Sequence, residues 1–445
     1  MTEGASDPSA VPLVAAHDTA GSTRRLAARM GWSLGDQALN SLTNFALGLI
    51  VARSLAPADF GAFSIAFATF LVAQNAARAV ATQPLLIRFA GVPRTEWRRG
   101  TGLATGAVLV VGIALGVGCL VAARVASGPL SEAMLALAVT LPGLLVRDTW
   151  RFAFFAAGRG RTAFLNDLFL ALVLAAALGV LLLAGRTSVF LATLAWGGAA
   201  GIAAVVGGFQ AGLWPRPRAA AAWWHEERDI GARYAGEVTA DAIASQVSLY
   251  AIAAIAGLSA VAALRAADIV LGPLNVLLQG LNLVTIAEGV RILQVSPRRL
   301  RDACMLLSVG LAVSTIAWGL AALAVPDALG TRLLGANWGP GRSVLLPATL
   351  SLVGLSTLTG AWVGLRALAA AGRSLRARVL SSTIMLACGI GGSIAGGTIG
   401  AAWGLFVGMW IGVLVWWWHF AVALREYRTP SVALSATGTP PIGDS

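Results

Sequence analysis

Stretches of about 20 apolar residues recur along nearly the whole chain, and this pattern constrains the fold more than any other feature. As a helix, each stretch is long enough to cross a hydrocarbon core of about 30 Å. The composition agrees, because 57% of the 445 residues are hydrophobic and 12% are charged, whereas a soluble domain needs more polar surface. The sequence therefore predicts an all-α polytopic membrane protein with about twelve transmembrane helices, at 32–53, 60–82, 101–124, 130–152, 163–184, 188–211, 233–255, 259–285, 303–325, 343–369, 379–396 and 399–424.

The distribution of arginine predicts the topology of these spans. The chain has no lysine, so its 32 basic residues are all arginine. If the N-terminus is cytoplasmic, 23 arginines fall in segments on the inside, against five on the outside, at positions 53, 124, 186, 332 and 342. Cytoplasmic loops of membrane proteins carry such an excess of basic residues. We expect both termini in the cytoplasm, and the net charge of +12 then requires no nucleic-acid partner.

An internal repeat predicts two lobes. Residues 156–163 read "AAGRGRTA" and residues 370–377 read "AAGRSLRA", each directly after the fourth span of a six-span set. Because six is even, both sets enter the membrane in the same orientation, which makes a parallel repeat. Between them, the segment from Trp214, with Trp223 and Trp224, predicts an interfacial linker. The expected domains are a cytoplasmic tail (1–30), an N-terminal six-helix lobe (31–212), a cytoplasmic linker (213–231), a C-terminal six-helix lobe (232–425) and a second tail (426–445).

Two segments carry a resemblance to a known family. The segment "GWSLGDQALNSLTNFALGLIVARSLAPADFGAFSIAFATF", residues 31–70, and the segment "AADIVLGPLNVLLQ", residues 266–279, resemble bacterial polysaccharide-export and lipid-linked oligosaccharide flippases. These belong to the multidrug/oligosaccharidyl-lipid/polysaccharide (MOP) flippase superfamily. The resemblance implies a two-lobed transporter in the bacterial cytoplasmic membrane. It would move a glycan carried on a polyprenyl (pyro)phosphate from the inner to the outer leaflet by alternating access.

Polar residues form a stripe within the first span. Asp36, Asn40 and Asn44 are four residues apart, so a helix places them on one face. Arg78 lies at matching depth on the next span. One interpretation is a structural Asp36–Arg78 ion pair, with the two asparagines as interhelical hydrogen-bond partners. The other is a hydrated cavity between the lobes, in which Asp36 acts in ion coupling or gating; the two can coexist.

The second half repeats this pattern loosely. Asp241 follows Glu237 on the seventh span, and the eighth span carries Arg265 and Asp268 one turn apart, before Gln279. Ionisable side chains within a bilayer are costly unless they face protein or water. We therefore predict that Asp241 and Asp268 act in ion coupling or gating, and that Arg265 and Gln279 contribute to substrate binding.

Arginines near the ends of the fourth and tenth spans have two interpretations. Long arginine side chains at helix ends reach toward the interface, which we expect of Arg151 and Arg366. Arg78 and Arg147 lie deeper, and guanidinium groups match phosphate oxygens in bidentate geometry. The predicted substrate-binding residues are therefore Arg78, Arg147, Arg265, Asn40, Asn44 and Gln279.

The residue content disfavours two alternative functions. A multidrug or cation antiporter of the same superfamily would favour acidic residues with few cations, whereas this chain offers Arg78, Arg147 and Arg265 beside its acids. A membrane glycosyltransferase or polymerase generally needs a large outer loop or domain with catalytic acids and histidine. Here the outer loops are short, and without lysine there is no P-loop.

The remaining expectations concern ligands and partners. Cys119, Cys304 and Cys388 have neither CxxC spacing nor neighbouring histidines, so we predict no metal site and no cofactor. Expected partners are the anionic lipid-linked glycan and membrane lipids, with H⁺ or Na⁺ as candidate coupling ions. We expect a monomer, alone or associated with glycan-assembly proteins, that is not an enzyme.

Overall fold

The computed structural model describes residues 19–226 and 246–427; within their helices, the side chains of 19–30, 275–284 and 286–287 are not described. These residues form helices and turns and no strand, which confirms the all-α fold class. Eight helices in the described residues are long and apolar enough to cross a membrane. Where the structure describes them, the predicted spans lie on helix, except for one or two end residues at 184, 188, 324–325 and 368–369. The chain is thus a multi-pass membrane protein.

Backbone contacts divide the chain into two compact units, and the division cuts through two helices. The first unit comprises Met1–Leu47 and Phe70–Gly236, and the second comprises Gly48–Thr69 and Glu237–Ser445. Helices α1 (Thr19–Ser54) and α2 (Pro57–Ala77) therefore each contribute to both units. The linker boundary predicted between the lobes falls partly outside the described residues and stays a prediction.

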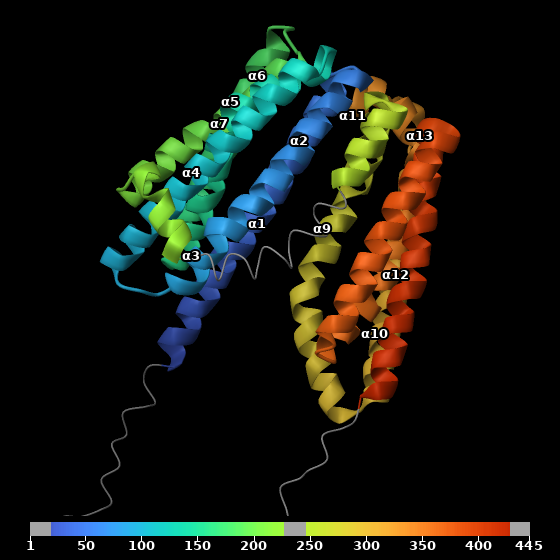
Figure 1. Ribbon diagram of the computed structural model, residues 1–445. Helices are drawn as coiled ribbons and strands as arrows, with labels where there is room; N and C mark the ends of the chain where they lie inside the picture. Colours follow the sequence, from blue (N-terminus) through green and yellow to red (C-terminus); the bar gives the residue numbers. More distant parts are fainter. Residues whose placement is uncertain (1–18, 227–245, 428–445) are drawn as a thin grey trace, which may run out of the picture. The chain divides into compact units, whose positions relative to one another are not determined.

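In the first unit, α5 is the central helix. The unit continues from α2 through a π-helical turn, η1 (Arg78–Thr82), into α3 (Gln83–Arg88). Helix α5 (Gly128–Ala156) packs against α4, α6 and α7, as the labelled ribbons of Figure 1 show. The bounds of its neighbours are Arg94–Val125 for α4, Gly160–Leu183 for α6 and Val189–Ala211 for α7; the short 3₁₀ turn η2 (Pro217–Ala219) follows.

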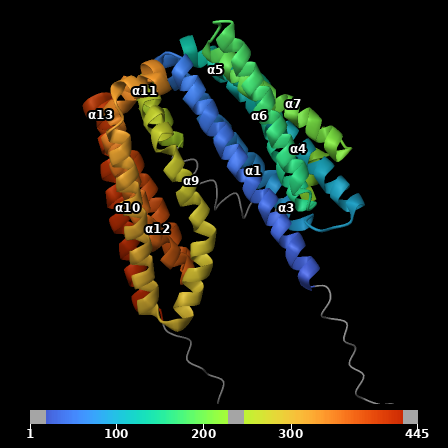
Figure 2. The same ribbon diagram turned by 180° about the vertical axis from the view of Figure 1, so that it is seen from behind.

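In the second unit, α12 (Trp338–Ala367) has the central place. It packs against α9, α10 and α13, which Figure 2 shows from behind. Thus the fourth span of each predicted set is the core helix of its unit. The bounds of the other helices are 246–256, Leu258–Val295 for α9, Pro297–Leu323 for α10, Asp327–Leu334 for α11, Gly335–Asn337 for η3 and Ala371–Glu426 for α13.

Helix α13 consists of two arms joined at a kink. The backbone leaves helical geometry at Gly396 and Gly397, and Gly397 has a φ of 56°, which favours glycine. The arms approach so closely that a Cβ atom on Gly392 would clash with the carbonyl oxygen of Gly400. The glycine-rich run of this region therefore serves close helix packing. The two arms correspond to the predicted spans 379–396 and 399–424.

The core helices of the two units end in the same type of turn. After α5, the N–H of Gly158 donates to the carbonyl of Phe155 and that of Arg159 to Phe154. After α12, Ala369 and Ala370 donate in the same way to Arg366 and Leu365. Gly158 (φ 68°) and Ala369 (φ 52°) both take the left-handed conformation that closes the turn. The turns therefore make Gly158 structurally equivalent to Ala369. An alignment of the repeated sequence AAGR would instead make Gly158 equivalent to Gly372.

One prediction about the linker was wrong. The side chain of Trp223 is fully buried, stacks on Phe89 with ring centroids 6.0 Å apart, and donates its indole N–H to the carbonyl of Val80. It is a core residue of the first unit rather than an interfacial anchor. Trp224, by contrast, is 52% exposed.

Candidate functional site

Six charged residues of the first unit form a network that is mostly buried. The network comprises three arginines and three aspartates: Asp36 on α1, Arg78 on η1, Arg147, Asp148 and Arg151 on α5, and Asp167 on α6. We call it the buried charge network. Its formal charges balance, which is how intramembrane ions are usually accommodated.

One arm of the network joins Arg78 to Asp148. The guanidinium donates two hydrogen bonds of 2.8 Å, from Nε to Oδ2 and from Nη2 to Oδ1. Gln74 donates a third bond of 3.0 Å to the same carboxylate, and the Arg78 guanidinium lies 5.1 Å from the ring centroid of Phe152. Such a bidentate pair fixes both side chains. The Arg78 side chain is nevertheless 28% exposed.

The other arm is more deeply buried and centres on Arg151. Its Nε donates to Oδ2 of Asp36 at 2.6 Å and lies 3.4 Å from Oδ2 of Asp167, while Gln37 accepts a further bond from Nη2. Arg147 Nη2 lies 2.5 Å from Oδ1 of Asp167, although the two groups are not aligned for a hydrogen bond. Asp36 and Asp167 are almost completely buried. This arm ties α1, α5 and α6 together.

The structure corrects two expectations about these residues. Asp36 does not pair with Arg78; it pairs with Arg151, and Arg78 pairs with Asp148. Arg151 does not reach the interface either, since it is 8% exposed and held by two carboxylates. The expected pair assumed that Asp36 and Arg78 would meet because they lie at matching depth on neighbouring spans. Instead, α5, the core helix, supplies the partner of each. Arg366 is exposed and lies 4.4 Å from the ring centroid of Trp362, as expected of a helix-end arginine.

Asp167 is the member of the network that sequence reasoning missed. It stands near the start of an apolar span, where a single acid looks like a solvated helix end. A charge balance would have found it, because the intramembrane arginines Arg78, Arg147 and Arg151 outnumber Asp36 and Asp148 by one. Arginine buried without a partner is too costly to persist.

Asn40 and Asn44 lie on the same face of α1 as Asp36 and are half-buried. Neither amide makes a side-chain hydrogen bond to another described residue of the chain, so they are not structural partners within the described part. Their donors and acceptors therefore remain available to a ligand.

Basic residues also line the turn that follows α5. Arg159 donates a 3.0 Å hydrogen bond to the carbonyl of Gln210, and its guanidinium lies 5.4 Å from the ring centroid of Phe154. Partial burial and the nearby positive charge of Arg94 lower the pKa of Arg159. The group stays cationic at neutral pH, so this turn carries a fixed positive charge.

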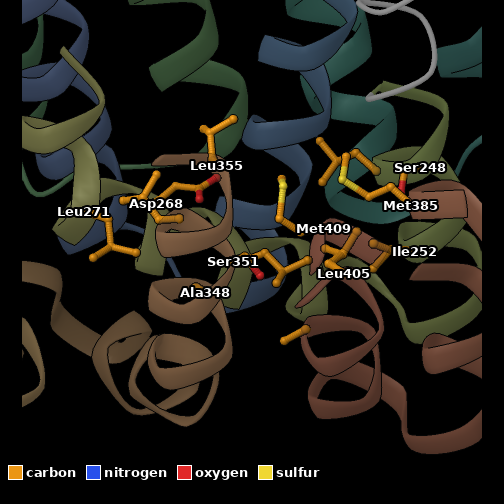
Figure 3. A pocket seen from close by; sticks show the side chains of 14 residues that line it. Ser248, Ile252, Asp268, Leu271, Ala348, Ser351, Leu355, Met385, Leu405 and Met409 are labelled. Atoms are coloured by element: carbon orange, nitrogen blue, oxygen red, sulfur yellow. The ribbon is translucent and has the colours of Figure 1, made fainter. Parts of the chain in front are cut away.

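In the second unit, Asp268 lines a cavity of about 300 Å³ that is otherwise mainly apolar. Figure 3 shows the carboxylate of this α9 residue among side chains from the helix 246–256, α12 and α13. Ser248 and Ser351 add the only other polar side chains among the described lining residues. Asp268 makes no ion pair or hydrogen bond to another described residue. We call this the Asp268 cavity.

The other predicted residues of the second unit are placed less fully. Arg265 is half-buried and lies 5.1 Å from the ring centroid of Phe67, which belongs to the same unit. Gln279 lies on α9, but its side chain is outside the described residues, and Asp241 falls in the segment 227–245, also outside them. The roles of these three residues stay predictions.

Comparisons with known proteins identify the fold of the chain. No family model matches the chain, and no curated protein matches it. Among solved structures, an inward-facing multidrug resistance MATE family transporter of the MOP superfamily matches with a TM-score of 0.64 and 13% identity, over 88% of this chain and 96% of that chain. The lipid II flippase MurJ, in an inward closed conformation, matches with a TM-score of 0.67 and 11% identity, over 89% and 90%.

A third match is to a MOP superfamily transporter from Pyrococcus furiosus, with a TM-score of 0.54 and 14% identity, over 91% of this chain and 96% of that chain. At these identities, what is shared is the arrangement of helices. The chain has the fold of the MOP-superfamily transporters.

Proposed function

We propose that the protein is a transporter that flips a polyprenyl-(pyro)phosphate-linked glycan precursor across the bacterial cytoplasmic membrane by alternating access. The observation that carries this proposal is the fold, which the chain shares nearly end to end with transporters, one of them a lipid II flippase. Fold does not determine cargo, so the assignment of cargo depends on the residues of the site.

The geometry of the first unit supports an anionic, sugar-bearing cargo at particular residues. Arg78 keeps 28% of its side chain exposed while Asp148 holds it, whereas Arg147 and Arg151 are each 9% exposed. Arg78 can therefore contact a phosphate without breaking the network. The amides of Asn40 and Asn44 suit glycan hydroxyls, because each offers both donors and an acceptor. Arg147 and Asp36 then hold the helices in place.

A direct test is flipping in proteoliposomes. A fluorescent polyprenyl-pyrophosphate disaccharide is placed in the inner leaflet, and its arrival outside is followed by quenching. The Asn40→Ala and Asn44→Ala double variant should slow flipping about tenfold, because it removes amides worth about 1–2 kcal/mol in contacts. Its folding is expected to be intact, since neither amide has a described partner. Arg332→Gln, which removes an exposed arginine of α11, is the matched control.

A cation antiporter is the second candidate, and the Asp268 cavity is the observation that favours it. A carboxylate in a mainly apolar cavity attracts an organic cation or binds a proton. The same vesicles, loaded with ethidium and given a pH gradient, test this candidate. Gradient-driven ethidium movement that is lost in Asp268→Asn, together with no flipping of the lipid-linked disaccharide, would overturn the flippase proposal.

A further inference from the structure

The helix that carries Arg78 changes its hydrogen-bond pattern at that residue. In the π-helical turn η1, the N–H of Gln83 donates to the carbonyl of Arg78, five residues back. The next residue, Pro84, has no N–H, so the donor that an α-helix would bring to the carbonyl of Val80 is missing. A π-helical turn inserts about one extra residue into a helix, and such turns are frequent at functional sites.

The indole N–H of Trp223 takes the place of this missing backbone donor. It donates to the carbonyl of Val80 at 3.1 Å, and the indole is fully buried. The same indole stacks on Phe89, the residue that follows α3. Phe89 in turn lies so close to α4 that a Cβ atom on Gly100 would clash with its ring. Trp223 therefore holds the chain both before and after α3.

The segment that carries Trp223 is itself docked on the first unit. At its start, the N–H of Arg216 donates to the carbonyl of Gly102 on α4 at 3.0 Å. At its end, the carboxylate of Glu226 pairs with Arg99 of α4 at 3.2 Å. The segment between these two contacts thus has a defined place, and it presents the Trp223 indole inward to η1.

The π-helical turn sets the rotation of Arg78 relative to α3. One extra residue rotates the helix before the turn by about 100° relative to the helix after it. With this rotation, the guanidinium of Arg78 forms its bidentate pair with Asp148, while α3 packs against α4 and α5. If the turn relaxed to a regular α-helix, either the ion pair or the packing of α3 would be lost.

A second buried indole of this unit shows what is particular to Trp223. Trp97 also donates to a backbone carbonyl, that of Ala153 at 2.9 Å. That carbonyl already accepts the N–H of Ala157 at the end of α5, so Trp97 adds a second bond to a paired group. Trp223 instead serves a carbonyl whose α-helical donor Pro84 has removed, two residues from Arg78.

We propose that Trp223 is a positioning residue for the cargo. By holding the π-helical turn, it fixes the direction in which Arg78 presents its partly exposed guanidinium to the phosphate. The proposal rests on the proposed function, in which Arg78 contacts that phosphate. Trp223 is fully buried, so it acts through Arg78 and does not touch the cargo.

Hydrogen–deuterium exchange of the protein in nanodiscs tests the hold on the turn without transport. Trp223→Phe keeps an aromatic ring beside Phe89 and removes the N–H. The amides of residues 79–89 should exchange about two- to tenfold faster, the range that corresponds to one hydrogen bond of about 0.5–1.5 kcal/mol. In the matched control Trp97→Phe they should exchange at the wild-type rate. Wild-type exchange in Trp223→Phe would overturn the proposal.

In the proteoliposome assay, the kinetic parameters separate positioning from stability. Trp223→Phe should raise the half-saturating concentration of the lipid-linked disaccharide about two- to tenfold and leave the maximal rate within about twofold. Trp97→Phe should lower the melting temperature to a similar extent but keep the wild-type half-saturating concentration. An equal rise in both variants would reduce Trp223 to a core residue and overturn its positioning role.

Two double variants test the route from Trp223 to the guanidinium. Arg78→Lys keeps the charge and loses the planar fork, so adding Trp223→Phe should raise the half-saturating concentration little further. Pro84→Ala restores a backbone N–H, so Trp223→Phe should again have less effect than it has alone. Additive effects in either pair would contradict a route through Val80 to Arg78.

The two proposals fail in different ways. If Trp223→Phe speeds exchange at residues 79–89 but the wild-type protein flips no lipid-linked disaccharide, the proposed function fails and the hold on the turn stands. If the wild type flips the disaccharide and Trp223→Phe changes neither the exchange nor the half-saturating concentration, the positioning role fails and the function stands.

Discussion

The corner where α5 meets α6 and the corner where α12 meets α13 share a backbone and differ in what fills them. Both follow the core helix of their unit, and both close with the same two hydrogen bonds and one left-handed residue. In the first unit the corner holds Arg147, Arg151 and Asp167, packed as ion pairs. At the offset that the two turns set, the corresponding residues of the second unit are Leu358, Trp362 and Arg378, which line a cavity of about 400 Å³ between α12 and α13.

The difference shows that one helical scaffold can support either buried ion pairs or a cavity. Ion pairs within a bilayer hold helices together strongly, because separating the partners leaves an uncompensated charge. Arg378 in the second corner is half-buried and lies 5.8 Å from the ring centroid of Trp416. We therefore expect the first corner to contribute more to stability than the second.

The largest expected effect is at Asp167, which neutralises Arg147 and Arg151. Asp167→Ala should lower the free energy of unfolding by about 3–5 kcal/mol, because it leaves buried arginine without its partner. Denaturation in detergent micelles, followed by circular dichroism, measures this change. The matched substitution at the other corner, Arg378→Ala, should cost less, about 1 kcal/mol, because Arg378 is half-buried whereas Asp167 is almost completely buried. Equal losses at both corners would contradict the comparison.

A charge transplant should produce a smaller, reversible effect. Leu358→Arg alone should destabilise the protein by about 2.5–3.5 kcal/mol, the cost of an arginine placed within a membrane helix. Adding Arg378→Asp recreates the pair that Arg147 and Asp167 make in the first unit, and should recover most of the loss. Thermal melting of the single and double variants tests this. A double variant no more stable than Leu358→Arg would show that the two corners are not equivalent.

The smallest expected effect concerns the turns. Among described residues other than glycine, Ala369 alone has a positive φ. Ala369→Gly should raise the free energy of unfolding by at most about 1 kcal/mol, because glycine takes this conformation without strain but costs entropy. Gly158→Ala at the matched position should lower it by a similar amount. The melting temperatures of the two variants measure these effects. If both melting temperatures changed in the same direction, Gly158 and Ala369 would not be equivalent.

The sequence was sufficient for the helices but not for the pairing of side chains within them. Apolar length predicts spans because a bilayer demands about 20 apolar residues per helix. The partner of Asp36, however, depends on which helix is central, and depth along neighbouring spans cannot show that. The correspondence of Asp167 to Arg378 likewise cannot be found from the sequence. Aligning the repeated letters AAGR shifts the two halves by three residues relative to the alignment that the hydrogen bonds of the turns give.

Helix α1 is an unbroken rod held at two separated points. Near its middle, Arg151 holds Asp36, and at its far end Asn337 donates to the carbonyls of Ala52 and Leu55 at 2.7 and 2.9 Å. The first hold lies in one compact unit and the second in the other. A proline placed between the two holds would remove one backbone hydrogen bond of α1 and kink the helix at that point.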